Sequence, residues 1–369
     1  MVKILYISST LKRTGPTNVL YNLIAELDRK KFEPIILTLS EEDPNFPSLW
    51  EAFEDLNVKI FSFNFSRIRS FISGRNEIRK FIVQQKINVV HLYGFRGDLM
   101  VNSAISKNVK IISTINSNIY DDYTMLYGKY TGMIMAYLHI KSLKGKIGVA
   151  CSNFVSEELK KRYSIDLKVI YNGIPCKEYT PASKQEQVNI RKKLKLPLDQ
   201  KIFIFVGYLI YRKDPITVIN AFLNSMTCEN STLLIIGDGP LMEECVEKCD
   251  LKKGNVKFLG NQPSTIDYLK ASDFYISSAY SEGLPTSVME AMSCGLPVIL
   301  SNIKPHEELV SNLNWNYLFP VNNDKKLSLI IDDIIEQDYD LLSNNCQSVI
   351  LNEINSNVMA TNYQLLYKI

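Results

Sequence analysis

The sequence predicts an α/β protein with two doubly wound domains, each built on a parallel sheet. The chain has 369 residues, a length that suits two domains better than one. Short, continuously apolar runs alternate with stretches of helical periodicity along most of it. A polar segment, 176–196, interrupts this alternation once, and the alternation then resumes. Apolar strands separated by helices are typical of parallel sheets covered on both faces.

The first half contains seven apolar runs that we expect to be strands. Helical periodicity lies between several of them. The expected strands are Lys3–Ser8, Phe32–Leu39, Val58–Phe63, Asn88–Tyr93, Lys110–Ile115, Lys146–Cys151 and Lys168–Tyr171, and the expected helices include Thr17–Asp28, Ser73–Gln85 and Lys129–Leu143.

The second half repeats this plan after the polar segment, which we interpret as the interdomain linker. The expected strands are Lys201–Val206, Thr232–Ile236, Val256–Leu259, Asp273–Ser278 and Pro297–Leu300, and the expected helices are Asp214–Leu223, Leu241–Cys249, Thr265–Lys270, Ser287–Cys294 and Lys325–Glu336. We therefore expect one domain over residues 1–180 and a second over 195–350, with ligands at the carboxyl ends of the strands.

Composition is that of an ordinary globular protein, with 46% hydrophobic and 22% charged residues. No uncharged apolar run approaches the roughly 20 residues of a membrane-spanning helix. The N-terminal sequence MVKILYISSTLKR resembles a first strand more than a secretory signal. Seven scattered cysteines, an odd number, indicate reduced thiols. We therefore predict a cytoplasmic protein.

Charge is divided unevenly between the two halves. Residues 1–184 hold 26 basic and 17 acidic residues, a net +9, whereas residues 185–369 hold 16 and 22, a net −6. The basic half either faces an anionic partner, such as phosphate or a membrane surface, or is solvated with no partner. Its basic residues are not arranged in a recognisable nucleic-acid motif, so we expect no nucleic acid as a partner.

One basic segment, 67–82, mixes arginines with apolar residues. If 75–85 is helical, Ile78, Phe81 and Ile82 share one face, while Arg75 and Arg79 lie near its edge. With Arg67, Arg69 and Lys80, this segment could hold the protein on an anionic membrane. The alternative is a core helix with a solvated basic edge.

The segment 277–295, SSAYSEGLPTSVMEAMSCG, follows an expected strand and opens an expected helix. The exposed N–H groups of a helix N-terminus form a ready anion site. Glu282 precedes this helix and Glu290 lies within it, so both carboxylates can border one pocket. Carboxylates bind vicinal hydroxyls well, and a pocket with phosphate and hydroxyl sites would suit a nucleotide sugar. The alternative is a glutamate that only stabilises the helix start.

These residues resemble glycosyltransferase family 4, whose signature is two glutamates separated by seven residues in a strand–turn–helix. The resemblance extends over nearly the whole chain and is stronger in the second half. It includes TGPTNVLYNL, VVHLYG and VACSNFVSEELKKRYSIDLKVIYNGI in the first half, and KIFIFVGYLIYRKDPITVINAF, LLIIGDGPLMEE, YLKASDFYISS, EGLPTSVMEAMSCGLPVILS and NYLFPVNNDKKLSLII in the second.

The resemblance implies a GT-B fold, in which two Rossmann-like domains face each other across a cleft. It implies an acceptor-binding first domain, a donor-binding second domain, and a C-terminal helix over about 355–369 that returns to the first. It further implies metal-independent transfer with retention of configuration and no cofactor. The donor would be a nucleotide sugar, most often a UDP-sugar, and the acceptor a saccharide, commonly lipid-linked, in lipopolysaccharide or capsule synthesis.

The resemblance also implies roles for individual residues. Lys213 would bind the donor diphosphate, with Arg212 beside it, Glu290 the ribose and Glu282 the transferred sugar. Further donor contacts are expected from Gly15, Gly207, Gly237, Gly283, Leu284, Pro285 and Thr286, although Pro285 has no N–H to donate.

The chain departs from the family pattern after its first strand. The family more often has two glycines there, whereas this chain has Gly15 and Pro16. We expect Gly15 to lie in a flexible turn before the helix that starts near Thr17.

The chain departs from the pattern at two further positions. Tyr208 stands where the family usually has an arginine, and Asn116 stands where it often has a histidine that contacts the reacting sugar. Asn cannot act as a general base near neutral pH. His91 is retained, either as a catalytic residue or as a core histidine. Catalytic candidates are therefore Glu282, His91 and Asn116, and the alternative function is a catalytically impaired nucleotide-sugar-binding protein.

Overall fold

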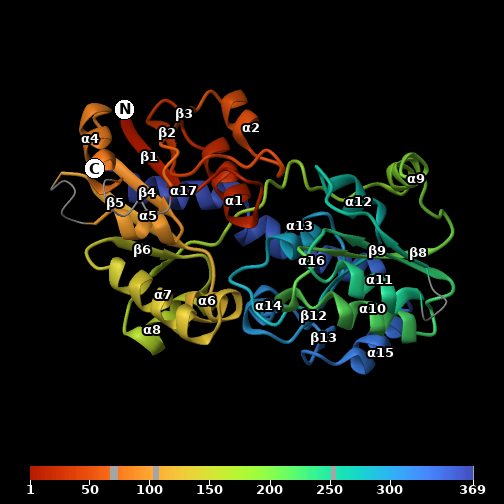
Figure 1. The fold of residues 1–369 in the computed structure, drawn as a ribbon. Coiled ribbons are helices and arrows are strands. Elements are labelled where there is room, and N and C mark those ends of the chain that lie inside the picture. Colours follow the sequence, from red (N-terminus) through yellow and green to blue (C-terminus); the bar gives the residue numbers. More distant parts are fainter. Residues whose placement is uncertain (67–73, 103–107, 251–254, 369) are drawn as a thin grey trace. The chain divides into compact units, whose positions relative to one another are not determined.

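The computed structural model describes residues 1–66, 74–102, 108–250 and 255–368, and the chain divides into two compact units. Unit 1 comprises residues 1–173 together with 356–369, and unit 2 comprises residues 174–355. Both units are α/β structures with an entirely parallel sheet (Figure 1). The C-terminal segment therefore belongs to the same unit as the N-terminus.

Unit 1 contains a seven-stranded sheet in the order β3-β2-β1-β4-β5-β6-β7. The chain crosses from one side of β1 to the other, so a topological switch point lies between β1 and β4. The strands are β1 Val2–Ser8, β2 Phe32–Thr38, β3 Lys59–Ser62, β4 Val89–Tyr93, β5 Lys110–Ile115, β6 Ile147–Ala150 and β7 Lys168–Val169, and the helices are α1 Gly15–Ala25, α2 Trp50–Asp55, α4 Arg75–Gln84, α5 Phe95–Met100, α6 Ile119–Tyr127, α7 Lys129–Ser142, α8 Asn153–Tyr163 and α17 Ser356–Tyr367.

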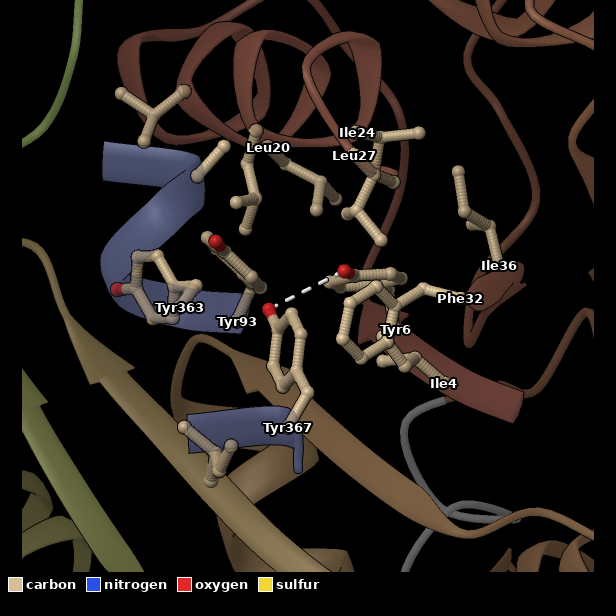
Figure 2. Close-up of a cluster of buried hydrophobic side chains, with 14 of the residues drawn as sticks. Ile4, Tyr6, Leu20, Ile24, Leu27, Phe32, Ile36, Tyr93, Tyr363 and Tyr367 are labelled. Atoms are coloured by element: carbon tan, nitrogen blue, oxygen red, sulfur yellow. Dashed lines mark hydrogen bonds between the residues drawn. The ribbon is translucent and has the colours of Figure 1, made fainter. Parts of the chain in front are cut away.

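The two faces of this sheet bury separate apolar clusters, because successive side chains of a strand point to opposite faces. On β1, Ile4 and Tyr6 belong to one cluster, and Leu5 and Ile7 to the other. Helices α1 and α17 cover the first face, where Tyr363 and Tyr367 of α17 lie near Tyr6 (Figure 2). Helix α4 covers the second face. The C-terminal helix is thus an integral part of the core of unit 1.

Unit 2 contains a six-stranded sheet in the order β10-β9-β8-β11-β12-β13, with its switch point between β8 and β11. The strands are β8 Lys201–Val206, β9 Ser231–Ile236, β10 Asn255–Phe258, β11 Phe274–Ser277, β12 Val298–Ser301 and β13 Leu318–Phe319, and the helices are α9 Lys184–Lys193, the 3-10 helix η2 Tyr211–Lys213, α10 Pro215–Asn224, α11 Met242–Asp250, α12 Ile266–Ala271, α13 Thr286–Ser293, α14 Lys304–Val310, α15 Asp324–Ile334 and α16 Tyr339–Glu353.

The polar segment 176–196, expected to be a linker, contains helix α9. Ser183 caps its N-terminus by accepting a hydrogen bond from the N–H of Glu186. Arg191, on the same helix, is buried and forms an ion pair with Asp273 at 2.8 Å. The segment looks like a linker in sequence because the helix is polar, yet the ion pair anchors it to unit 2.

No helix within the described ranges is long and apolar enough to cross a lipid bilayer.

Candidate active site

The residues of the two-glutamate motif lie at the switch point of the sheet in unit 2. One loop follows β8 and contains Arg212 and Lys213, and the other follows β11 and contains Glu282. In a doubly wound sheet, the loops at this point diverge and leave room for a ligand. The sheet order therefore brings together two segments about 70 residues apart in sequence.

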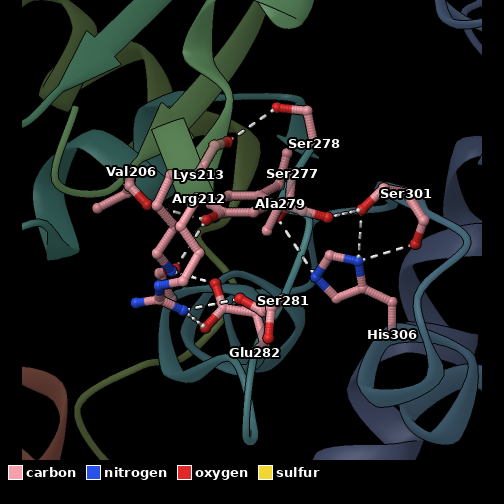
Figure 3. Close-up of polar contacts among 12 residues, drawn as sticks. Val206, Arg212, Lys213, Ser277, Ser278, Ala279, Ser281, Glu282, Ser301 and His306 are labelled. Atoms are coloured by element: carbon pink, nitrogen blue, oxygen red, sulfur yellow. Dashed lines mark hydrogen bonds and ion pairs between the residues drawn. The ribbon is translucent and has the colours of Figure 1, made fainter. Parts of the chain in front are cut away.

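Glu282 forms ion pairs with both neighbouring cations (Figure 3). One carboxylate oxygen accepts a hydrogen bond from Nζ of Lys213, and the other lies 3.1 Å from Nη1 of Arg212. The Glu282 side chain is buried, which alone would raise its pKa, but the charges of Lys213 and Arg212 outweigh burial and lower the pKa to about 2. Glu282 is therefore ionised at neutral pH, and the three groups carry a net charge of +1.

The loop after β11 is held in place by hydrogen bonds to the loop after β8. The hydroxyl of Ser278 donates to the carbonyl oxygen of Asp214 at 2.6 Å, and the N–H of Tyr280 donates to the carbonyl of Arg212 at 2.9 Å. These bonds fix the backbone on either side of the charge cluster. The ion pairs thus form between two rigidly connected segments.

His306, which sequence reasoning did not single out, supports the same loop from α14. Its Nδ1 lies 2.9 Å from the carbonyl oxygen of Ser301, whose hydroxyl donates to the carbonyl of Ala279 at 2.7 Å (Figure 3). Burial lowers the pKa of His306 to about 4, so the ring is neutral near pH 7. This buried histidine helps to position the loop after β11 through its contact with Ser301.

Two glycines shape the turns after β8 and β9. Gly237 has a φ of +133°, and a Cβ there would lie 1.9 Å from the carbonyl oxygen of Gly207. The N–H of Gly207 in turn donates to Ile236. Gly237 is therefore required by the close approach of two backbone segments, whatever the ligand.

The remaining motif residues lie at or within α13. The backbone segment Gly283–Pro285 is buried, α13 begins at Thr286, and Pro285 occupies the N-cap position. Glu290 follows one turn later and is half-buried. The strand–turn–helix expected here is present, and the helix begins one residue before the predicted start.

Unit 1 has its own cavity of about 290 Å³ at the carboxyl ends of β1, β4 and β5, beside its switch point. Its wall includes hydroxyl, amide and cationic groups as well as aromatic rings, a lining suited to a polar organic ligand. The lining residues are Ser8, Ser9, Thr10, Lys12, Thr14, Pro16, Thr17, Leu20, Tyr93, Gly94, Thr114, Ile115, Asn116, Ser117, Ile119, Tyr123 and His139.

Behind Tyr123, at the wall of this cavity, lies a buried polar network. The hydroxyl of Tyr123 is 2.8 Å from Nδ1 of His139, and Nε2 of His139 is 3.0 Å from Oδ2 of Asp98. Lys146 forms an ion pair with the other carboxylate oxygen of Asp98 at 3.0 Å. Burial would raise the pKa of Asp98, but the hydrogen bond from His139 and the charge of Lys146 lower it. Sequence reasoning missed this network because its directly contacting members are 16–48 residues apart in sequence and share no motif.

The profiles of known protein families match both halves of the chain. The profile of the Glycosyl transferases group 1 matches residues 186–349, and that of Glycosyltransferase Family 4 matches residues 13–178. This chain belongs to glycosyltransferase family 4.

Individual relatives agree with this assignment. The glycosyltransferase is 24% identical to an Escherichia coli UDP-Gal:alpha-D-GlcNAc-diphosphoundecaprenol alpha-1,3-galactosyltransferase, over 96% of this chain and 93% of that one. It is 26% identical to the Staphylococcus aureus capsular polysaccharide biosynthesis glycosyltransferase CapH, over 84% of each chain. Among solved structures, Anabaena Alr3699/HepE in complex with UDP-glucose superposes with a TM-score of 0.82 at 16% identity, over 99% of both chains. The predicted GT-B fold and family are confirmed.

His91 of the glycosyltransferase lies in the core of unit 1. Its two ring nitrogens lie 2.7 Å from the hydroxyls of Tyr367 and Thr114, respectively, and the residue is fully buried. Burial lowers its pKa to about 3. Of the two interpretations left open by the sequence, this geometry favours a core histidine that ties the C-terminal helix to the sheet, and it gives no support to a catalytic role.

Asn116 and Gly15 lie in or beside the cavity of unit 1. Asn116 is part of its wall, and its side-chain oxygen accepts a hydrogen bond from Asn172 at 3.4 Å. Gly15 was expected in a flexible turn before the helix, but it is the first residue of α1 and its neighbours Thr14 and Pro16 line the cavity. The prediction of a turn was wrong because the hydrogen bond from the Thr14 N–H to Thr17 starts the helix earlier.

The basic segment 67–82, considered as a membrane contact, lies partly outside the described residues. Arg67 and Arg69 lie outside the described residues. In α4, Ile78, Phe81 and Ile82 are buried in the core of unit 1, while Arg75, Arg79 and Lys80 are exposed. The apolar face of α4 is therefore unavailable to a bilayer. This arrangement matches the alternative stated from the sequence, a core helix with a solvated basic edge.

Proposed function

We propose that this glycosyltransferase transfers a sugar from a UDP-sugar to a saccharide acceptor, with retention of anomeric configuration. We further propose that the acceptor is lipid-linked and that the reaction belongs to bacterial surface polysaccharide synthesis in the cytoplasm. The printed activities of the relatives support this, since they include a galactosyltransferase acting on a diphosphoundecaprenol acceptor and a capsular polysaccharide enzyme. The HepE complex with UDP-glucose supports UDP as the nucleotide.

The observation that carries the proposal is the ion cluster of Glu282, Lys213 and Arg212. As the bond to the donor sugar breaks, negative charge grows on the nucleoside diphosphate that leaves. Lys213 and Arg212 would stabilise this charge directly, without a divalent ion. Glu282 holds both cations in place before the donor binds and accepts hydrogen bonds from sugar hydroxyls. Glu290 would bind the ribose.

We place the acceptor in the cavity of unit 1. Its volume and its mixture of hydroxyl and aromatic side chains suit a sugar ring, whose faces are apolar and whose edge is polar. Tyr123 would accept a hydrogen bond from an acceptor hydroxyl, because its own proton can be donated to His139. This assigns to Tyr123 a positioning role that compensates for the missing family histidine at Asn116.

A donor screen followed by a transfer assay tests the proposal. A stabilising shift in thermal unfolding with UDP and with one UDP-sugar, but with no GDP- or ADP-sugar, would identify the donor, since ligand at 100 times its Kd adds about 2.7 kcal/mol. Transfer to a diphosphoprenyl-linked saccharide is then followed with EDTA present, and the anomeric configuration of the product is read by NMR. A donor that binds but is never transferred would instead favour the catalytically impaired binding protein.

A further inference from the structure

Helices α6 and α7 carry an unusual concentration of exposed apolar side chains. Of the 22 large apolar residues that are exposed in the described part of the chain, eight lie between residues 125 and 138. We call these eight the α6–α7 surface; they are Met125, Leu126, Tyr127, Tyr130, Met133, Ile134, Tyr137 and Leu138. Contiguous apolar patches of this kind mark interaction sites.

The burial of the side chains along α7 shows that both faces of this helix are apolar, the face packed against unit 1 and the outer face. Ala136, His139 and Ile140 are buried on one side, whereas Tyr130 and Ile134 on the other are 78% and 62% exposed. A helix on a protein surface normally presents charged and polar residues to water, and one that is apolar all round is normally buried. The outer face of α7 therefore requires an apolar partner.

Close packing keeps this outer face in place. A Cβ at Gly132 would lie 2.4–2.5 Å from backbone atoms of Tyr123 and Thr124, so α7 crosses α6 with its backbone in direct contact. The two helices consequently form one rigid support. Their apolar residues cannot turn inward without breaking it.

The basic residues around the α6–α7 surface indicate which kind of partner it binds. Residues 123–156, which include all eight members of the surface, contain four lysines and no aspartate or glutamate. The two acidic residues of α6, Asp121 and Asp122, lie in its first turn, before the surface begins. Lys129, Lys141 and Lys144 are exposed, and Nζ of Lys141 lies 6.0 Å from the ring centroid of Tyr137, inside the surface. Lysines that surround apolar and tyrosine side chains are typical of surfaces that bind the headgroup region of anionic membranes.

An adjoining cavity extends the same chemistry. It has a volume of about 480 Å³, and its wall combines Tyr137, Ile140 and Leu143 with the two lysines 141 and 144. Apolar walls with cations among them suit a lipid, whose chains are apolar and whose headgroup is anionic.

A second copy of this chain fits the surface less well. In a twofold dimer the same patch meets itself, so the exposed lysines of one copy would approach those of the other with no acidic residue from 123–156 between them. Anionic lipid, by contrast, complements both the apolar residues and the charge.

We propose that the α6–α7 surface docks the glycosyltransferase on an anionic lipid bilayer. This docking rests on the proposed function only for its biological purpose. Tyr123 and His139, on the same two helices, line the acceptor cavity, so docking would bring that cavity to the membrane where a lipid-linked acceptor resides. The α6–α7 surface, and not α4, is then the principal membrane contact, because the apolar face of α4 is buried.

Vesicle co-sedimentation of the full chain tests the proposal. We expect binding to vesicles of phosphatidylglycerol and phosphatidylcholine, weak binding to phosphatidylcholine alone, and weakening by salt. Leu126→Ser, Tyr130→Ser and Ile134→Ser together should weaken binding roughly tenfold or more, because each side chain then loses its apolar contact. Lys129→Gln, Lys141→Gln and Lys144→Gln together should weaken it on the order of a hundredfold, at about 1 kcal/mol per charge.

Matched variants separate this surface from general hydrophobicity and from α4. Val83→Ser, Leu329→Ser and Leu365→Ser alter side chains that are 57–65% exposed, comparable with the 59–78% of the three test residues, and should bind vesicles like the parent. Arg75→Gln, Arg79→Gln and Lys80→Gln together should reduce binding far less than the three lysine changes do. The opposite ranking would overturn the proposal, as would full binding by the serine variant.

A spectroscopic probe reports insertion directly. The two native tryptophans, Trp50 and Trp315, lie outside the surface, so Trp50→Phe and Trp315→Phe leave Tyr130→Trp as a single reporter. Its emission should shift to the blue on anionic vesicles and be quenched by brominated lipid; an unchanged spectrum with bound vesicles would contradict docking here. Light scattering that shows a dimer in the parent and a monomer in the serine variant would assign the surface to a second copy instead.

Failure of docking and failure of the proposed function are distinguishable. The vesicles contain only phospholipid, so binding needs neither donor nor acceptor. Transfer to a soluble acceptor analogue needs no vesicle, and the serine variant should retain it.

Discussion

The hydroxyl oxygen of Tyr123 lies 2.8 Å from Nδ1 of His139, whose other nitrogen lies 3.0 Å from a carboxylate oxygen of Asp98. The ionised carboxylate of Asp98 only accepts, so Nε2 of His139 must donate to it. In the neutral ring Nδ1 then has only a lone pair, and the tyrosine proton points toward it. Tyr123 is left with lone pairs to offer to a ligand hydroxyl.

Tyr123→Phe removes this acceptor while keeping the ring. We expect the KM for the acceptor to rise roughly two- to tenfold, the value of one hydrogen bond of about 0.5–1.5 kcal/mol, with donor affinity unchanged. Initial rates against a soluble acceptor and UDP binding by calorimetry measure the two effects. Tyr127→Phe, one turn further along α6 and 54% exposed, is the control and should behave like the parent. An effect on donor affinity alone would contradict the positioning role.

Glu282→Gln should separate donor binding from turnover. The change removes the negative charge that Lys213 and Arg212 share, so the cluster carries +2 instead of +1. We expect UDP to bind a fewfold more tightly at low salt, and the rate of sugar transfer to fall by more than tenfold because the carboxylate is lost. Calorimetry with UDP and a saturated transfer assay give both values. Weaker UDP binding with normal turnover would show that the roles of Glu282 and Glu290 are reversed.

Sequence patterns predicted the fold well because the strands are continuously apolar. Lys110–Ile115 and Lys201–Val206 have the predicted bounds, since each is buried on both faces and begins at a polar residue. The two-residue strand β13, Leu318–Phe319, is too short to produce a pattern. Helix α9 was missed because a polar helix held by one buried ion pair looks like a linker in sequence.

The candidate site was predictable only where its residues fall in one motif. Glu282 and Glu290 share a strand–turn–helix, but the pairing of Glu282 with Lys213 depends on the order of β8 and β11 in the sheet. The Asp98–His139 contact likewise depends on tertiary packing of α5 against α7. His91 shows the converse, because its position in a motif gave no indication that Tyr367 would occupy one of its nitrogens.

Lys213→Ala and Glu290→Ala should each weaken UDP-sugar binding while leaving the fold intact. Loss of a charged hydrogen-bond partner to a ligand costs roughly 1.5–3 kcal/mol, or about 10- to 150-fold in Kd. Lys304→Ala, which breaks a surface ion pair with Glu307, is the matched control and should leave Kd unchanged. Donor affinities equal to that of the parent in both test variants would remove this donor site.

The buried histidines should make each unit less stable as the pH falls. Burial holds the pKa of His91 at about 3 and that of His306 at about 4, whereas in the unfolded chain both titrate near 6.5. Between these values the unfolded state binds a proton that the folded state does not, so stability is full above pH 6.5 and decreases below it, by up to about 1.4 kcal/mol per pH unit for each histidine.

The two tryptophans allow the units to be followed separately, since Trp50 belongs to unit 1 with His91 and Trp315 to unit 2 with His306. Urea unfolding from pH 7 to 4.5 is followed by fluorescence in Trp315→Phe and in Trp50→Phe. Adding His91→Asn should lower stability at pH 7, because the hydroxyls of Tyr367 and Thr114 lose their partner, yet it should flatten the pH dependence reported by Trp50. The dependence reported by Trp315 should stay as before and flatten only with His306→Asn. If the stability reported by Trp50 still decreases with falling pH in the absence of His91, other groups cause the acid sensitivity of unit 1.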